Sequence, residues 1–235
     1  MSEAVIVSAA RTPIGRAYRG AFNNLASPSM ASYAISAAVE RSGVDPDEIE
    51  DCIFGAAMQQ GTQGFNLGRQ AAIAAGLPVS VAGTTVDRQC SSGLMSIAMG
   101  AKHIALDGAS VVIAGGCESI SLVQNENMNL HRIVDEELTH MHPSIHMPML
   151  QTAEVVADRY GITREAMDEY GFQSQQRTAA AYKEGRYEDE LAPVQCNRIV
   201  WNKETGEQSE VESTVSAEEG IRETTLEGLA GLKTV

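Results

Sequence analysis

A cysteine between a short strand-like segment and an amphipathic segment places the strongest constraint on this chain. Residues 82–86 have the small and β-branched composition of a strand, and the polar residues 87–93 follow. Apolar side chains then recur three and four positions apart from residue 94 to residue 105, which predicts a helix with one buried face. The sequence therefore predicts a strand, a turn and a helix in direct succession, with Cys90 in the turn.

Cys90 occupies a position that suits a nucleophile. The predicted helix begins directly after it, and the unpaired backbone N–H groups at a helix N-terminus stabilise a thiolate. Small residues at 91–93 leave room for a substrate to approach the backbone. Acyl-transfer enzymes carry their nucleophile at such a strand–turn–helix elbow. Spacing alone also allows the alternative that Cys90 is a buried structural cysteine, as most free cysteines are.

Strand-like and helix-like segments alternate over residues 4–116. This alternation predicts an α/β layer structure with a mainly parallel sheet. The strands are expected at residues 4–9, 52–56, 82–86 and 110–114, and the helices at 30–41, 66–75 and 94–105.

The pattern changes after residue 116. Residues 117–148 are rich in Asn, His, Met and acidic side chains and have little periodicity, which indicates an ordered loop or short irregular helices. Helices are expected at 152–160, 163–184 and 225–233, and two strands around a turn at 203–207. The change predicts two domains, an α/β half over residues 1–116 and an inserted loop domain over residues 117–235 that covers it.

Composition argues against several classes of function. The net charge of −14 speaks against nucleic acid as a partner. We expect no secretory signal and no membrane span, because the first residues lack a basic and apolar leader and no apolar run is long enough. The four cysteines form no Cys-x-x-Cys pair, which indicates free thiols in a reducing compartment and predicts a cytoplasmic protein.

Three neighbouring histidines, His140, His142 and His146, raise the question of a metal site. Their spacings are loose, and no carboxylate or cysteine lies between them. We therefore expect no metal in this segment.

Six segments, in order along nearly the whole chain, resemble motifs of the thiolase family. The segment Asp87-Arg88-Gln89-Cys90-Ser91-Ser92-Gly93 resembles the nucleophile motif of that family. The others lie at residues 5–15, 114–119, 152–162, 185–193 and 229–233. The resemblance implies the thiolase fold, with a layered α-β-α first half and an inserted loop domain that covers the acyl-CoA site.

The resemblance also implies an activity. Thiolases cleave 3-ketoacyl-CoA with CoA, or form it by the reverse Claisen condensation, through an acyl thioester on the nucleophilic cysteine, here Cys90. No cofactor is implied, because coenzyme A is itself a substrate. Pro148 ahead of Met149 resembles the degradative 3-ketoacyl-CoA enzymes, which implies a role in fatty acid β-oxidation.

Two further residues take expected roles from the resemblance. Met149 occupies the position of a methionine that packs on the pantetheine arm of CoA. Arg222 aligns with an arginine at the nucleotide end of CoA, where a guanidinium stacks on adenine or pairs with phosphate. The alternative for Arg222 is a solvated side chain in an acidic segment. Leu150 stands where most thiolases have glycine, which affects the expected loop geometry.

In thiolases a second α/β half follows the loop domain. It carries a Gly-His-Pro motif, whose histidine activates the nucleophile, and a Cys-x-Gly-x-Gly motif, whose cysteine acts as acid and base. Neither motif occurs in this chain. We therefore expect a second polypeptide or a further C-terminal half to supply both, and a dimer or tetramer as the assembly. The alternatives are a half-thiolase that only binds acyl-CoA or serves in assembly, and a related condensing enzyme such as a ketosynthase.

Overall fold

Contacts along the chain divide it into two units. The structure is a computed structural model that describes residues 3–234. The larger unit comprises Met1–Met128 and Glu188–Gly220, and the smaller comprises Asn129–Tyr187 and Ile221–Val235. The domain boundary that the sequence suggests between residues 116 and 117 stays a prediction.

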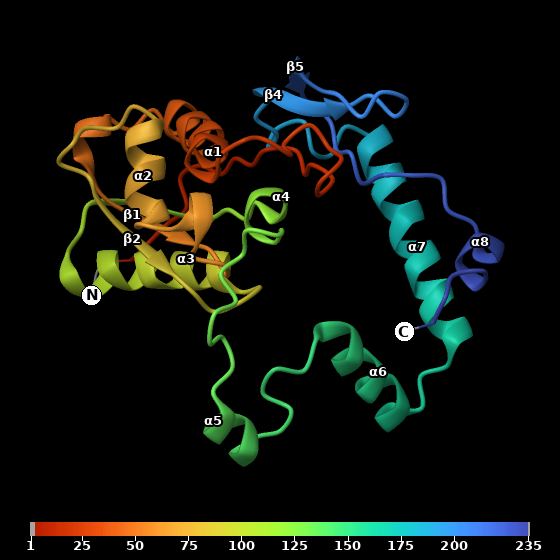
Figure 1. The fold of residues 1–235 in the computed structure, drawn as a ribbon. Helices are drawn as coiled ribbons and strands as arrows, with labels where there is room; N and C mark the ends of the chain where they lie inside the picture. Colours follow the sequence, from red (N-terminus) through yellow and green to blue (C-terminus); the bar gives the residue numbers. More distant parts are fainter. Residues whose placement is uncertain (1–2, 235) are drawn as a thin grey trace. The chain divides into compact units, whose positions relative to one another are not determined.

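A three-stranded parallel sheet forms the centre of the larger unit (Figure 1). Its strands are β1 (Ile49–Gly55), β2 (Ala82–Val86) and β3 (Val111–Gly116), in the order β2-β1-β3. Gly55 pairs with Val86 of β2 and with Gly116 of β3, so the carboxyl ends of all three strands lie level with one another. The parallel sheet confirms the predicted α/β class.

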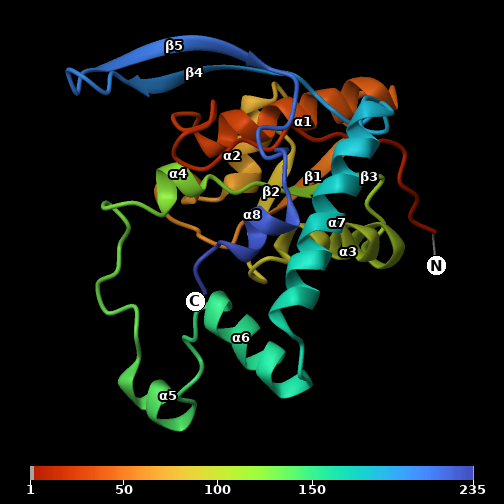
Figure 2. The ribbon, with the colours of Figure 1, turned by 90° about the vertical axis from the view of Figure 1, so that its right-hand side faces the viewer.

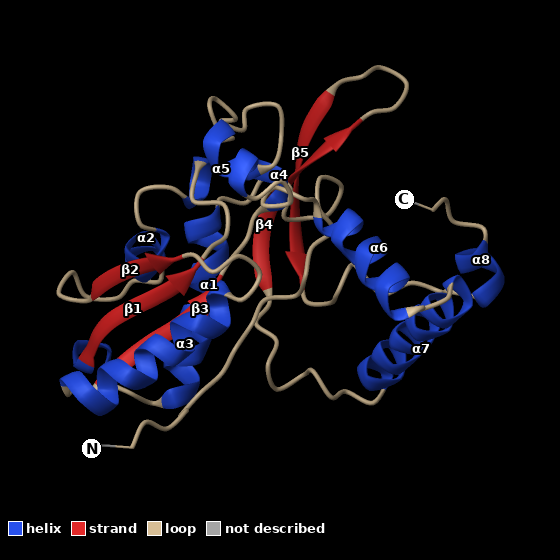
Figure 3. Ribbon diagram, turned by 90° about the horizontal axis from the view of Figure 1, so that it is seen from below, coloured by secondary structure: helices blue, strands red, loops and turns tan. Residues whose placement is uncertain are grey.

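Helices cover both faces of this sheet. Helices α1 (Ser27–Ser42) and α2 (Leu67–Ala74) lie on one face, and α3 (Ser92–Lys102) lies on the other (Figures 1 and 3). The helices on the two faces, with the sheet between them, form the layered α-β-α arrangement that was predicted. The core beneath α1 and α2 is apolar and includes Ile35, Ile49, Cys52, Phe54, Leu67, Ala71 and Val81.

Short helical elements connect these layers. They are the 3₁₀ turns η1 (Pro46–Glu48) and η2 (Gly61–Gln63), the π-helical turn η3 (His103–Asp107) after α3, and the single turn α4 (Ile120–Val123) after β3. The apolar periodicity that extends to residue 105 thus continues through a change of helix type.

Residues 4–9 form no strand, which contradicts the prediction for this apolar segment. The described sheet has the order β2-β1-β3, so its outer edges lie at β2 and β3, and residues 4–9 pair with neither of them. Backbone hydrogen bonds of this part of the chain begin at Arg11, which donates to Glu190 O at 2.9 Å and accepts from Ala192 N at 2.8 Å. Ahead of Arg11 the chain runs as an extended loop (Figure 2), and Ile6 is 79% exposed.

An antiparallel hairpin completes the larger unit. It consists of β4 (Val194–Trp201) and β5 (Gln208–Val215), and it confirms the two strands that were predicted around the turn. Its first residues pack beside the segment that leads into α1, where Phe22, Met30, Val194 and Cys196 are buried together.

The smaller unit is helical in its described residues. It contains α5 (Glu136–Met141), α6 (Met149–Tyr160), α7 (Arg164–Lys183) and α8 (Leu226–Ala230). Thr163 caps α7 by accepting from Ala166 N, and Arg164 ties α8 to α7 by donating to Leu229 O at 2.6 Å. The helices predicted at 152–160 and 163–184 are confirmed, whereas the last helix is shorter than predicted. No helix among residues 3–234 is long and apolar enough to cross a membrane.

Candidate active site

Cys90 lies in a tight turn at the end of the sheet. Strand β2 ends at Val86, and α3 begins at Ser92, so only five residues join them. The Cys90 thiol is exposed, whereas Ser92 is buried against the sheet. The predicted strand, turn and helix in direct succession are confirmed, and they place the thiol ahead of the first turn of α3.

The turn contains a backbone conformation that residues other than glycine rarely adopt. Gln89, directly before Cys90, has a φ of 49°, in the left-handed region. Its N–H donates to Asp87 Oδ1 at 2.7 Å, and its carbonyl accepts from Ser92 N at 3.0 Å. Strain of this kind persists only where neighbouring contacts fix it, and it often occurs at functional sites.

Glycines allow the start of α3 to sit directly on the sheet. A side chain at Gly55, the last residue of β1, would place its Cβ 2.3 Å from the Ser92 carbonyl carbon. A Cβ at Gly116 would lie 3.1 Å from Gly93 Cα. The buried Ser96 hydroxyl reaches both Gly93 O at 2.6 Å and Gly115 O at 2.7 Å. The elbow that carries Cys90 is therefore fixed by close packing against the ends of β1 and β3.

A buried polar network supports the loop after β3, and the sequence analysis did not find it. Gln63 is fully buried and donates to Glu118 Oε1 at 2.6 Å, while its own Oε1 accepts from Ser119 N. The second oxygen of Glu118 accepts from Ala57 N at 2.8 Å. Because buried polar groups are costly without partners, these bonds hold the loop in one conformation. Polarity alone gives no sign that residues 55 positions apart are paired.

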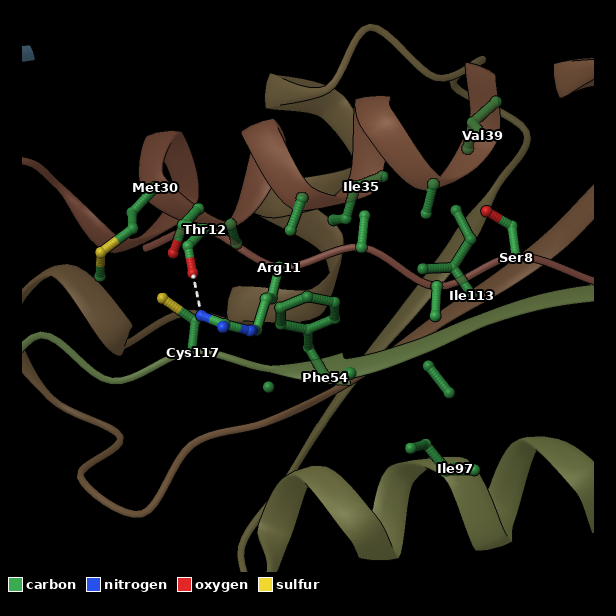
Figure 4. Close-up of a pocket in the computed structure, with 18 of the residues that line it drawn as sticks. Ser8, Arg11, Thr12, Met30, Ile35, Val39, Phe54, Ile97, Ile113 and Cys117 are labelled. Atoms are coloured by element: carbon green, nitrogen blue, oxygen red, sulfur yellow. Dashed lines mark hydrogen bonds between the residues drawn. The ribbon is translucent and has the colours of Figure 1, made fainter. Parts of the chain in front are cut away.

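A cavity of about 760 Å³ lies along β3 in the larger unit (Figure 4). Residues 4–17 line one side of it, and Cys90 is not among the lining residues. The apolar residues that line it come from α1, β1, α3 and β3 and include Ile35, Val39, Phe54, Ile97 and Ile113. The cavity exists where residues 4–9 do not pair with the sheet, and it is separate from the elbow.

Comparison with known proteins identifies the family. The family model described as "Thiolase, N-terminal domain" matches residues 4–235. The chain belongs to the thiolase family.

Individual thiolases match along nearly the whole chain. A 3-ketoacyl-CoA thiolase of Bacillus subtilis is 38% identical over 99% of this chain and 59% of its own length. An acetyl-CoA acetyltransferase of Cupriavidus necator is 38% identical over 83% of this chain and 51% of its own length. The crystal structure of the Bacillus anthracis acetyl-CoA acetyltransferase superposes with a TM-score of 0.80 at 33% identity, over 99% of this chain and 59% of that one. The thiolase fold is confirmed, and the chain spans 59% or less of the length of these relatives.

The two residues expected to bind CoA lie in the smaller unit of this thiolase domain. Met149 is the first residue of α6 and is 68% exposed. Arg222 is exposed in an irregular segment between β5 and α8, where its carbonyl accepts from the Thr224 hydroxyl at 3.3 Å. Both side chains are accessible, and their roles toward CoA stay predictions.

The other three cysteines of the thiolase domain are poor nucleophiles. Burial, aided by the Asp51 charge, raises the pKa of Cys52 to about 12. Burial and the neighbouring Glu118 raise the pKa of Cys117 to about 12 as well. Burial also raises the pKa of Cys196, whose thiol contacts Ala21 O at 3.3 Å.

We therefore expect iodoacetamide to label Cys90 first between pH 7 and pH 9. Thiols with a raised pKa stay protonated in this range, and only the thiolate reacts. Peptide mapping after partial alkylation measures the order of labelling. Faster labelling of Cys52, Cys117 or Cys196 than of Cys90 would contradict the assignment.

Proposed function

We propose that this protein transfers acyl groups between CoA thioesters, with Cys90 as the nucleophile. It cleaves 3-ketoacyl-CoA with CoA to acetyl-CoA and a shortened acyl-CoA, or runs the reverse Claisen condensation. The observation that carries the proposal is the exposed Cys90 thiol in a strained elbow at the start of α3. The names of the relatives, 3-ketoacyl-CoA thiolase and acetyl-CoA acetyltransferase, support this reaction.

In the proposed cleavage, the Cys90 thiolate attacks the 3-keto carbon of the substrate. The bond between C2 and C3 then breaks, its electron pair leaves with acetyl-CoA, and C2 takes up a proton. The acyl group remains on Cys90 as a thioester. The thiolate of a second CoA attacks that thioester and restores the free Cys90 thiolate. The Cys90 backbone N–H donates to the oxyanion in this scheme. Coenzyme A is the substrate, and the scheme uses no further cofactor.

The proposal assigns the proton transfers to residues outside this chain. A second half or a second polypeptide carries the activating histidine and the second cysteine, and the complete protein forms a dimer or tetramer. Leu94 and Ile97 support a partner at α3, because they are 71% and 41% exposed next to the elbow. Exposed apolar side chains that are grouped in this way are typical of a surface that another domain or chain covers.

The proposal includes a degradative role. Pro148 ahead of Met149, together with the 3-ketoacyl-CoA thiolase among the relatives, supports β-oxidation of fatty acids. The free cysteines support a reducing compartment, for which we propose the cytoplasm. Medium-chain 3-ketoacyl-CoA should accordingly be cleaved at least as well as acetoacetyl-CoA by the complete protein. Met149 and Arg222 are the proposed contacts to the pantetheine arm and to the nucleotide of CoA.

Covalent capture tests the proposal in the full-length protein. Incubation with 3-ketoacyl-CoA in the absence of free CoA should add one acyl mass to the peptide that contains Cys90 and release one acetyl-CoA. Later addition of CoA should remove the adduct as acyl-CoA. Mass spectrometry of the protein and chromatography of the CoA esters measure both steps. Tight binding of acyl-CoA without any adduct would instead favour a non-catalytic binding subunit.

A further inference from the structure

The Ser92 side chain bridges both ends of the strained turn before Cys90. Its Oγ accepts a hydrogen bond from Arg88 N at 2.8 Å and donates one to Gln89 O at 2.6 Å. Ser92 is 4% exposed, so water does not compete for these bonds. One hydroxyl group therefore satisfies the N–H that enters the turn and the carbonyl immediately before Cys90.

The backbone of Ser92 is held in place by close packing against the sheet. It packs so closely on the end of β1 that no Cβ fits at Gly55, 2.3 Å from its carbonyl carbon. Its own N–H also donates to Gln89 O, at 3.0 Å. The Ser92 hydroxyl thus connects the packed start of α3 to the exposed residues Arg88 and Gln89.

Gln89 needs such a connection. A glutamine at a φ of 49° is strained, and a turn of this kind relaxes unless other contacts fix it. Relaxation at Gln89 would rotate the peptide that leads into Cys90 and move the thiol. The hydrogen bond from Gln89 N to Asp87 Oδ1 is exposed and fixes only the first half of the turn.

We propose that Ser92 is the positioning residue of the nucleophile, which holds Gln89 in its left-handed conformation and thereby places the Cys90 thiol. The assignment rests on the proposed role of Cys90. Ser92 touches neither substrate nor reacting atoms in this proposal. It acts on the thiol through the backbone of the turn.

The neighbouring Ser91 provides a matched control. Its hydroxyl donates to Arg88 O at 2.9 Å, but it is exposed and makes no bond to Gln89. Ser91→Ala therefore removes the same group from the same turn without releasing the strained peptide. Gln89→Gly provides the complementary change, because glycine adopts a positive φ without strain.

The test measures the rate of Cys90 alkylation by iodoacetamide in the full-length protein, with peptide mapping and thermal unfolding. Ser92→Ala should slow alkylation of Cys90 by about tenfold, the effect of one hydrogen-bonded bridge, and Ser91→Ala by less than about twofold. The double variant Ser92→Ala/Gln89→Gly should recover most of the rate, because the strain that Ser92 holds is then gone. If Ser92 acted only on overall stability, the alkylation rates of all the variants would instead follow their thermal unfolding temperatures.

Three outcomes would overturn the proposal. They are equal rates for Ser92→Ala and Ser91→Ala, a double variant no faster than Ser92→Ala, and loss of the folded state in both Ser92 variants. Alkylation does not depend on turnover, so these results are separate from a failure of the proposed reaction. A wild-type protein that alkylates at Cys90 but forms no acyl thioester would reject the reaction and leave the positioning role standing.

Discussion

Replacing Cys90 with serine should reduce thiolysis by at least about 10⁴-fold and abolish the acyl adduct, while thermal unfolding stays unchanged. A serine hydroxyl ionises far less readily than a thiol, so the serine variant forms far less of the nucleophile. The side chain is exposed, so the loss of the larger sulfur atom leaves no cavity in the core. Steady-state rates with 3-ketoacyl-CoA and the mass of the Cys90 peptide measure the two effects.

Cys196→Ser is the matched control for this change. The same atom is exchanged in the same unit, where a serine hydroxyl can keep the bond to Ala21 O. This variant should retain thiolysis within about twofold, because the thiol takes no part in the proposed reaction. Retained turnover in Cys90→Ser, or an acyl adduct on another cysteine, would remove Cys90 from its role.

The elbow could be predicted from the sequence because its signals are local. The apolar spacing from Leu94 onward defines a helix, and the short segment before Asp87 defines a strand, so Cys90 between them has one possible place. Motifs spread along the chain indicated the family for the same reason, since each is a short string that can be recognised by itself.

The strand predicted at residues 4–9 shows where this reasoning ends. An apolar segment indicates that a strand can form, but it does not show that the segment pairs. In the described sheet the outer edges of β2 and β3 are open, and residues 4–9 still pair with neither. The first long-range contacts after this segment are made by Arg11, whose Nε lies 2.7 Å from Glu190 Oε1 and whose guanidinium also pairs with Glu218. Those carboxylates lie about two hundred residues away, and no local pattern points to them.

The support beneath Cys90 also escaped prediction, although part of its signal is in the sequence. Gly55 ends a strand, and Gly93 lies in the first turn of a helix, but their contact appears only when the two ends meet. The φ of Gln89 has no sequence signal at all, because glutamine rarely adopts it. Short local motifs in the sequence thus identify the nucleophile, whereas long-range contacts determine the position of its thiol.

Gly55→Ala should therefore lower both the stability of the fold and the reactivity of Cys90. The new Cβ would lie 2.3 Å from Ser92 C and 2.5 Å from Gly93 N, which are backbone atoms that cannot rotate away. The start of α3 has to move off the sheet, and Cys90 moves with it. We expect the free energy of unfolding to fall by about 3 kcal/mol. We expect thiolysis to fall by about 10²-fold, since catalysis is sensitive to small displacements of the nucleophile.

Gly220→Ala separates this steric effect from the general effect of replacing a glycine. A Cβ at Gly220 meets no atom within 4 Å, and its φ lies outside the left-handed region, so denaturant unfolding and thiolysis should both stay near the wild-type values. If Gly55→Ala unfolds like Gly220→Ala and keeps full turnover, α3 is not seated on β1 as described. If it folds with normal stability but loses turnover, the displacement is confined to the elbow, and the position of the thiol rather than the strength of the fold limits the reaction.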